Sequence, residues 1–274
     1  MKIGINLMLF GATPEAWPDD LPRLLSAAGA DWIEVPTFDP KPSAFAGIAK
    51  CLRDLNLGVS VSSALPAGVS AVADRNAAGR WSDFLSRLAD TAHALGADLA
   101  IGPLYHPVGE FASGAQADLH ARLAQRLAGW RSPAPVRFAL EPLNRFETNV
   151  LNLCADGARV IDAAGNQEFG LMADTFHMHI EERDPIAAFR ELGSRCLHFH
   201  ASENDRGAIG SGQINWSAWF AAIRARELPV VVAECFSAGL GELAAATRIW
   251  RDVAGIPEDC ASRSLSFLRN HLTA

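Results

Sequence analysis

The chain has 274 residues, of which 49% are hydrophobic and 20% are charged. A chain of this length and composition can bury a substantial core within one domain. Its 24 basic and 31 acidic residues give a formal net charge of -7 without a basic block. A protein that binds the phosphate backbone of nucleic acids is therefore not expected.

The N-terminal sequence MKIGINLMLFG contains an apolar stretch that is too short to span a membrane. It also lacks a small-residue cleavage site, so we expect a first strand and a cytoplasmic protein with no membrane partner. The five cysteines are scattered and never form a C-x-x-C pair. This pattern predicts neither a disulfide framework nor a thiolate metal site.

Eight short apolar runs along the chain are typical of buried strands. They cover residues 3–9, 32–36, 58–64, 99–103, 136–141, 169–174, 196–200 and 229–234. Between them, apolar residues recur at helical spacing, as in Leu21, Leu24, Leu25 and Ala28. Gly29, Gly58 and Gly96 are expected in left-handed turns that lead from a helix to a strand. Asp184 and Asn215 are expected to begin helices.

The regular alternation of strands and helices is typical of an α/β fold with a parallel sheet. Eight βα units in about 250 residues match a (β/α)8, or TIM, barrel. No change in composition or low-complexity segment divides the chain. We therefore expect one barrel domain over residues 1–274 that ends in a C-terminal helix.

Four successive strand candidates end in side chains that bind metal ions, namely Glu141, Asp174, His200 and Glu234. Residues two apart in a strand share a face, so each of the four is expected to be the last inward-facing residue of its strand. Carboxylate oxygens with one imidazole suit Mn²⁺, Mg²⁺ or Co²⁺ better than structural zinc. The pattern predicts one divalent ion at the mouth of a barrel.

Each motif alone also has a structural interpretation. Glu141 can be the salt-bridge partner of Arg137 or Arg145, and a buried His198 needs a partner for its ring nitrogens. A doubly wound sheet shares the βα alternation, but it would spread residues from four strands over roughly 15 Å. A closed barrel brings them together, and coincidence would have to place four ligand-type residues at successive strand ends.

Four segments carry a resemblance to a known family: EPLNRFETN (141–149), DTFHMHIEE (174–182), HFHASENDRG (198–207) and AECF (233–236). They resemble the corresponding segments of the ketose 3-epimerases, a family within the xylose-isomerase-like TIM barrels. The likeness continues upstream through SSALPAG (62–68) and LGADLAIGPLY (95–105). His179 and the segment YHPVGEF (105–111) depart from the pattern, which leaves the preferred sugar open.

The resemblance implies specific roles for residues of this chain. One set matches the family's metal ligands: Glu141, Asp174, His200 and Glu234. Of these, Glu141 and Glu234 match its paired catalytic acid and base. Another set matches positions that contact substrate oxygens near the reacting carbons: Glu147, His177 and Arg206.

The function implied by this resemblance is inversion of carbon 3 in free ketoses of the D-tagatose, D-fructose/D-allulose or L-ribulose type. One carboxylate would remove the proton, a metal-stabilised enediolate would form, and the second carboxylate would return the proton on the other face. Among divalent ions, Mn²⁺ is expected in preference to Mg²⁺ or Co²⁺. The resemblance also implies that the protein forms a homodimer or a homotetramer.

Other functions remain open on the same fold, because function depends on the site. One alternative is an aldose-ketose or hydroxypyruvate-type isomerase, which would move a proton between carbons 1 and 2. A second is an enzyme for sugar phosphates, with the phosphate received by Arg206 and the loop 210–212. A third is a sugar-binding module without catalysis.

Overall fold

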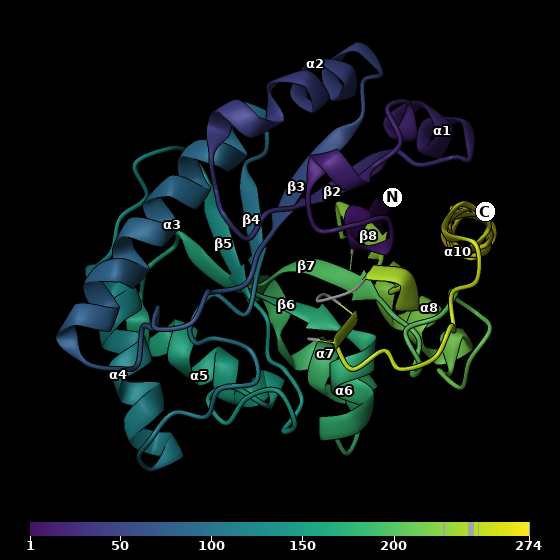
Figure 1. Cartoon of the computed structure of the whole chain (residues 1–274). Coiled ribbons are helices and arrows are strands. Elements are labelled where there is room, and N and C mark those ends of the chain that lie inside the picture. The colour runs from purple at the N-terminus through teal and green to yellow at the C-terminus, as the bar shows by residue number, and fades with distance from the viewer. Residues whose placement is uncertain (227, 241–243, 246, 274) are drawn as a thin grey trace.

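Eight parallel strands close into a barrel in sequential order (Figure 1). The computed structural model describes residues 1–226, 228–240, 244–245 and 247–273. The strands are β1 (Lys2–Asn6), β2 (Trp32–Pro36), β3 (Gly58–Ser62), β4 (Leu99–Gly102), β5 (Arg137–Leu140), β6 (Phe169–Asp174), β7 (Cys196–Ala201) and β8 (Val230–Ala233). β1 pairs with both β2 and β8, which closes the ring and confirms the expected (β/α)8 barrel.

Most strand bounds agree with the apolar runs to within one or two residues. The prediction of strand over residues 3–9 is wrong beyond Asn6, because Leu7–Leu9 form a short 3-10 helix. The Asn6 side chain accepts a hydrogen bond from the backbone N–H of Met8 and so begins this turn. β5 and β8 end one residue before Glu141 and Glu234.

The two faces of the barrel strands differ in chemistry because side chains alternate along a strand. The outward face packs under the helices and includes the fully buried Ile3, Ile5, Val35, Val61, Phe138, Leu171 and Phe199. Toward the carboxyl ends, the inward face carries buried polar groups, among them Asn6, Glu34, Ser60, Ser62 and His198. The barrel interior near the carboxyl ends of the strands therefore contains a network of polar groups.

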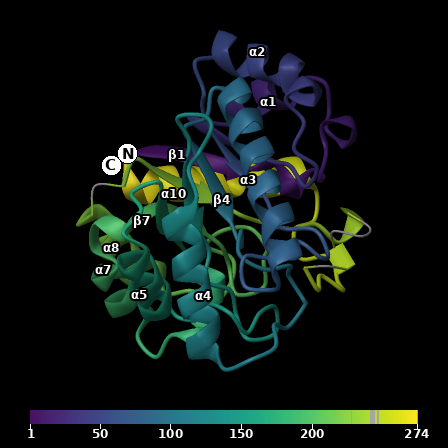
Figure 2. The same cartoon turned by 90° about the vertical axis from the view of Figure 1, so that its left-hand side faces the viewer.

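Helices cover the outside of the barrel (Figures 1 and 2). They are α1 (Leu21–Ala27), α2 (Ala46–Asp54), α3 (Arg75–Leu95), α4 (Gln116–Gly129), α5 (Cys154–Ala164), α6 (Thr175–Glu181), α7 (Pro185–Glu191), α8 (Trp216–Arg224) and α10 (Pro257–Leu272). The expected helix starts are confirmed, because the side chains of Asp184 and Asn215 accept hydrogen bonds from backbone N–H groups in the first turns of α7 and α8. α10 contacts β1 and β8 where the ring closes.

The predictions for the turn glycines are confirmed at two positions and wrong at the third. Gly29 and Gly96 have φ angles of 98° and 86°. Before β3 the left-handed residue is Asn56, with φ of 54°, whereas Gly58 is the first residue of the strand. A Cβ atom on Gly58 would lie 1.9 Å from Cε3 of Trp32, so the glycine makes room for the indole ring.

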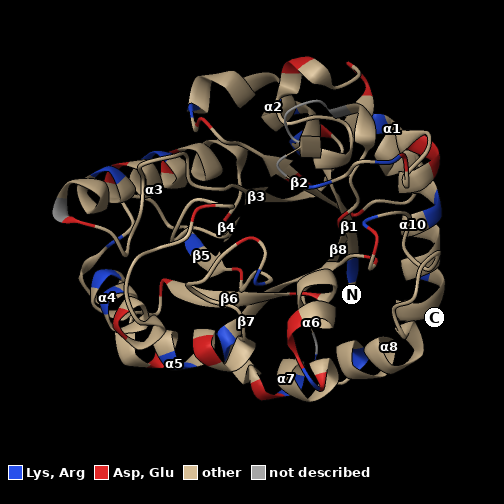
Figure 3. Ribbon diagram, turned by 60° about the horizontal axis from the view of Figure 1, so that its bottom comes forward, with Lys and Arg blue, Asp and Glu red and all other residues tan. Residues whose placement is uncertain are grey.

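Both chain ends lie at the pole opposite the strand carboxyl ends, where Met1 and Thr273 line one surface hollow with Pro229 (Figure 2). Acidic and basic residues are interspersed on the outer helices (Figure 3). None of the helices in the described residues is long and apolar enough to cross a membrane. The carboxyl-end pole, which in TIM barrels carries active sites, is where the candidate residues meet.

Candidate functional site

The four predicted metal ligands converge at the carboxyl ends of β5 to β8. Each of Glu141, Asp174, His200 and Glu234 offers one ligand atom, and these atoms all lie within 4.8 Å of one another. All four side chains are buried, with at most 7% exposure. The closed barrel therefore brings together residues that are far apart in the sequence.

The two carboxylate oxygens of Asp174 have different partners. Its Oδ1 accepts hydrogen bonds from the backbone N–H groups of Phe176 and His177, at 2.6 and 3.1 Å, and so caps α6. This leaves Oδ2 facing His200 and Arg206, at 3.7 and 3.2 Å. Burial alone would raise the pKa of Asp174, but the charge of the neighbouring Arg206 holds it well below its ordinary value.

Glu141 follows β5 directly and is held through its backbone. Its carbonyl oxygen accepts from the buried Tyr105 hydroxyl at 2.9 Å, and its N–H donates to the Gly102 carbonyl at 3.1 Å. Burial, followed by the charges of Glu234 and Asp174, raises the pKa of Glu141 well above its ordinary value. The carboxyl group therefore favours its protonated form when no cation is bound.

Glu234 is oriented by side chains from both sides of the barrel mouth. Its Oε2 accepts from Nη1 of Arg206 at 2.7 Å, and its Oε1 lies 3.3 Å from Nδ2 of Asn6. Its backbone carbonyl accepts from the Ser202 hydroxyl at 2.9 Å. These contacts fix the position of the Glu234 carboxyl group at the barrel mouth.

Arg206 is buried at the centre of the site. Besides Glu234, its Nη1 contacts Asp174 and the Ser202 hydroxyl, and its guanidinium carbon lies 3.8 Å from the ring centroid of Phe176. Its φ of 66° is in the left-handed region, which costs free energy in a residue other than glycine. Backbone strain at a buried arginine is typical of a functional position.

His177 presents one ring nitrogen to the protein and the other to the cavity. Its Nδ1 accepts from the backbone N–H of Asn144 at 3.1 Å, and the Asn144 amide also donates to Oε1 of Glu147. Burial and the neighbouring charge of Arg206 lower the pKa of His177, which favours the neutral ring. Nε2 lies 3.7 Å from Oε1 of Glu141 and 2.9 Å from Nη2 of Arg206, which can only donate. Donors therefore approach both ring nitrogens, and the neutral ring accepts from one of them at a time.

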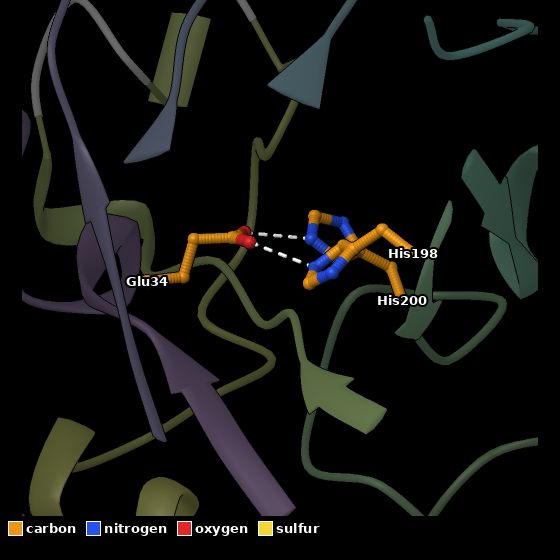
Figure 4. Close-up of side chains that lie close together, drawn as sticks. All are labelled: Glu34, His198 and His200. Atoms are coloured by element: carbon orange, nitrogen blue, oxygen red, sulfur yellow. Dashed lines mark hydrogen bonds and ion pairs between the residues drawn. The ribbon is translucent and has the colours of Figure 1, made fainter. Parts of the chain in front are cut away.

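Glu34 is a further member of the site and was not among the residues predicted from the sequence. It lies on β2 with no exposed surface, and Figure 4 shows its carboxylate directed at both His198 and His200. Nε2 of His200 lies 2.7 Å from Oε1, and Nε2 of His198 lies 2.8 Å from Oε2. The available signal was an acidic residue at an inward position of an otherwise apolar strand. Glu34 lies next to His198, but neither ring nitrogen of His198 makes a hydrogen bond among the described residues.

The cluster fits a divalent cation. Three carboxylates, those of Glu141, Asp174 and Glu234, are buried side by side with Arg206 as a cation among them. Nδ1 of His200 is buried, faces these carboxylates and makes no hydrogen bond. Closely spaced buried carboxylates repel one another, and a dication offsets this repulsion while it uses the lone pair on Nδ1.

A cavity of about 130 Å³ opens onto the cluster. Six of the seven predicted site residues line it: Glu141, Glu147, His177, His200, Arg206 and Glu234. Asp174 contacts His200 and Arg206 but is not among the lining residues. Pockets for drug-sized ligands have roughly 300–1,000 Å³, so this cavity suits a small polar molecule.

The alternative salt-bridge interpretations of Glu141 are wrong. Arg145 pairs with Glu181, with Nε to Oε1 at 2.9 Å, and Arg137 donates to the Gln167 carbonyl. Glu141 therefore keeps its carboxylate for the cavity. The His179 side chain is exposed, unlike that of His177.

Comparison with known proteins agrees with this geometry. The family described as "Xylose isomerase-like TIM barrel" matches residues 22–271. The chain is 33% identical over 262 residues to L-ribulose 3-epimerase of Mesorhizobium japonicum, covering 92% of this chain and 88% of that protein. It is 39% identical over 174 residues to a probable ketose 3-epimerase of Synechocystis, where the match spans 61% of this chain and 60% of that relative's length.

A solved structure of an L-ribulose 3-epimerase superposes with a TM-score of 0.90 at 29% identity, covering 99% of this chain and 94% of the other. The predicted resemblance is therefore confirmed at the level of both sequence and fold. The chain belongs to the xylose isomerase-like TIM barrel family, among its ketose 3-epimerases, and is an enzyme of the isomerase class.

Proposed function

We propose that this enzyme inverts carbon 3 of free ketoses with the help of one divalent metal ion. The observation that carries the proposal is that Glu141 and Glu234 meet at one small cavity, within 4.8 Å of each other and of two further ligand-type side chains. Inversion needs two acid/base groups, one to remove a proton and one to return it on the other face. The names of the related proteins support ketoses as the substrates.

The residues that would hold the ion are Glu141, Asp174, His200 and Glu234. Their oxygen-rich donor set favours Mn²⁺, with Mg²⁺ or Co²⁺ as alternatives. When bound, the ion would act as a Lewis acid toward the substrate's carbonyl and hydroxyl oxygens and so favour loss of the adjacent proton.

The two catalytic carboxyl groups have different neighbours. Oε2 of Glu234 accepts a hydrogen bond from Nη1 of Arg206 at 2.7 Å, whereas Oε1 of Glu141 lies 3.7 Å from Nε2 of His177. Paired carboxyl groups in different surroundings are typical of acid/base catalysis. In one direction Glu234 would take the carbon 3 proton and Glu141 would deliver one, and the roles would exchange in the reverse direction.

The remaining site residues are suited to bind and orient the sugar. Nη2 of Arg206 is a donor that contacts Nε2 of His177 at 2.9 Å in the cavity that both residues line, so a substrate oxygen beside them would accept from Arg206. Such donors stabilise negative charge that develops on oxygen. Glu147, which lines the same cavity, would accept a hydrogen bond from a substrate hydroxyl.

The loop 210–212 supports free sugars over sugar phosphates. The backbone N–H of Gly210 donates to Oε1 of the buried Glu203 at 2.8 Å. A Cβ on Gly212 would lie 2.3 Å from Oε2 of the same carboxylate. A carboxylate therefore already occupies the place that a phosphate would take, and the two anions would repel each other.

The test is the position at which a ketose takes up deuterium when the enzyme is incubated in heavy water. We expect uptake at carbon 3 and its loss, by at least about a hundredfold, in both Glu141→Gln and Glu234→Gln, since each lacks one proton carrier. The exposed Glu110→Gln is the matched control and should retain the wild-type rate.

Near-normal exchange in both active-site variants would contradict the two-carboxylate scheme. Uptake at carbon 1 or 2 would indicate an aldose-ketose isomerase. Binding of ketoses without exchange for any sugar tested would indicate a sugar-binding module.

A further inference from the structure

The carboxylate of Glu34 is surrounded by polar groups of the protein. Oε1 accepts from Nδ2 of Asn6 at 2.8 Å and from Nε2 of His200 at 2.7 Å. Oε2 accepts from the Ser60 hydroxyl at 2.8 Å and lies 2.8 Å from Nε2 of His198, at an angle that is poor for a hydrogen bond. Because Glu34 has no exposed surface and does not line the cavity, it does not touch a substrate.

These contacts determine which nitrogen of His200 carries hydrogen. A carboxylate accepts hydrogen bonds and cannot donate them, so Nε2 of His200 must be protonated to approach Oε1 at 2.7 Å. In the neutral ring the lone pair is then on Nδ1, which lies 3.3 Å from Oε1 of Glu234 and 3.7 Å from Oδ2 of Asp174. Figure 4 shows the Glu34 carboxylate directed at the His200 ring.

The same network extends to Glu234 through Asn6. The Asn6 amide nitrogen donates to Glu34 and lies 3.3 Å from Oε1 of Glu234. Its amide oxygen accepts from the backbone N–H of Met8, which fixes the orientation of the amide group. Glu34 is thus connected to two of the four ligand side chains of the cluster.

A second metal site formed by Glu34, His198 and His200 is the alternative, since their donor atoms lie close enough to hold an ion. The hydrogen bonds argue against it. Nε2 of His200 is used as a donor, and the two further partners of the carboxylate, Asn6 Nδ2 and Ser60 Oγ, also donate to it. An ion would have to displace these donors, and a hydrogen-bonded Glu34 needs no ion to be satisfied.

We infer that Glu34 is a positioning residue, which fixes the ring plane and tautomer of His200 so that Nδ1 presents its lone pair to the ion. The inference rests on the proposed metal site and deepens it. Carboxylates that accept from the second nitrogen of a ligand histidine typically change metal affinity by roughly 10- to 100-fold when removed.

The first test needs no substitution. Protein labelled with ¹⁵N at histidine and loaded with diamagnetic Mg²⁺ is studied by long-range ¹H–¹⁵N correlation NMR. We expect His200 to carry hydrogen on Nε2 and a lone pair on Nδ1. The opposite tautomer would overturn the inference.

The second test compares Glu34→Met and Glu34→Gln by calorimetric titration of the ion-free protein with Mn²⁺ alone. Methionine has a similar length but cannot accept the hydrogen bond from Nε2, so we expect binding roughly 10- to 100-fold weaker. Glutamine keeps one acceptor oxygen, so we expect its affinity to lie closer to that of the wild type.

Val232→Ala is the matched control, because Val232 is fully buried and is the β8 residue paired with His200. It removes packing but no hydrogen bond, so Mn²⁺ affinity should stay within about threefold of wild type. Wild-type affinity in Glu34→Met, equal weakness in both Glu34 variants, or two ions per wild-type chain would overturn the inference. No sugar is used, so failure of the epimerase proposal would be seen separately, as absence of carbon 3 exchange.

Discussion

Arg206 contacts four other members of the site through its guanidinium group. Its Nη1 lies near Asp174, Glu234 and Ser202, while its Nη2 lies near His177. Burial would lower the pKa of Arg206, but the charges of Asp174 and Glu234 raise it above its ordinary value, so the guanidinium stays charged. The planar guanidinium group of arginine, with its several N–H donors, suits this position, whereas the single ammonium group of lysine does not.

We therefore predict that Arg206→Lys lowers kcat by roughly a hundredfold or more, because one ammonium group cannot reach these partners together. Steady-state kinetics with a ketose gives the measurement, and the melting temperature checks that the variant is folded. Arg251→Lys, an exposed arginine beside the neighbouring larger hollow, is the control and should leave kcat unchanged. A kcat within threefold of wild type in Arg206→Lys would remove this residue from the proposed mechanism.

For single residues, the sequence was sufficient to predict that Glu141, Asp174, His200 and Glu234 lie together, because each stands at the end of a recognisable strand. It was not sufficient for Glu34 or Asn6. Their roles depend on pairing between β1 and β2 and on the approach of β2 to β7 across the barrel, which no local pattern encodes. An acidic residue within an apolar strand indicates a buried partner but does not say which one.

At the scale of elements, apolar runs predicted the strands well because parallel barrel strands are covered by helices and are apolar on the outward face. Turn chemistry was predicted less well. Asn56 adopts the left-handed conformation that was assigned to Gly58, and Gly58 is needed for a contact with Trp32 that lies on another strand. A glycine required by packing and a glycine required by φ look the same in a sequence.

Two glycine substitutions test whether Gly58 is required for packing. In Gly58→Ala the new Cβ would lie 1.9 Å from Cε3 of Trp32, whose Nε1 is held by the Ser60 hydroxyl at 2.9 Å. We predict a loss of about 1–3 kcal/mol in the free energy of unfolding, as is typical of overpacking.

Gly79 is the matched control, because it is exposed within α3 and a Cβ there would meet no atom within 4 Å. Gly79→Ala should gain about 0.5–1 kcal/mol, since alanine favours the helix. Denaturant unfolding of both variants measures the two changes. If both substitutions changed the free energy of unfolding in the same direction, the packing role of Gly58 would be contradicted.

At the scale of the whole molecule, closure of the barrel is what turns four separated strand ends into one site. A flat sheet would leave the outer pair, Glu141 and Glu234, about three strand spacings apart, or roughly 15 Å. In the closed ring their ligand atoms lie within 4.8 Å. The number of βα units was enough to predict this convergence, because eight units are what closes the ring.

The same convergence gathers negative charge in the barrel interior, and this links the ion to the stability of the whole fold. The buried carboxylates of Glu34, Glu141, Asp174 and Glu234 have Arg206 as their nearby guanidinium. An ion that binds the folded chain and not the unfolded one stabilises it by about 2.7 kcal/mol at a hundred times its Kd. We predict that chelation lowers the melting temperature by several degrees and abolishes carbon 3 exchange, and that Mn²⁺ restores both.

Asp174→Asn provides the control for this prediction. It keeps an oxygen that can cap α6 but removes a charged ligand, so Mn²⁺ should raise its melting temperature much less than that of the wild type. If chelated wild-type protein, free of metal by elemental analysis, kept its melting temperature and full exchange activity, the carboxylate cluster would have to be stabilised by Arg206 and by protonation of Glu141. The raised pKa of Glu141 predicts that protonation is a second way to relieve this charge, so we expect the ion and the proton to compete for the same carboxyl group.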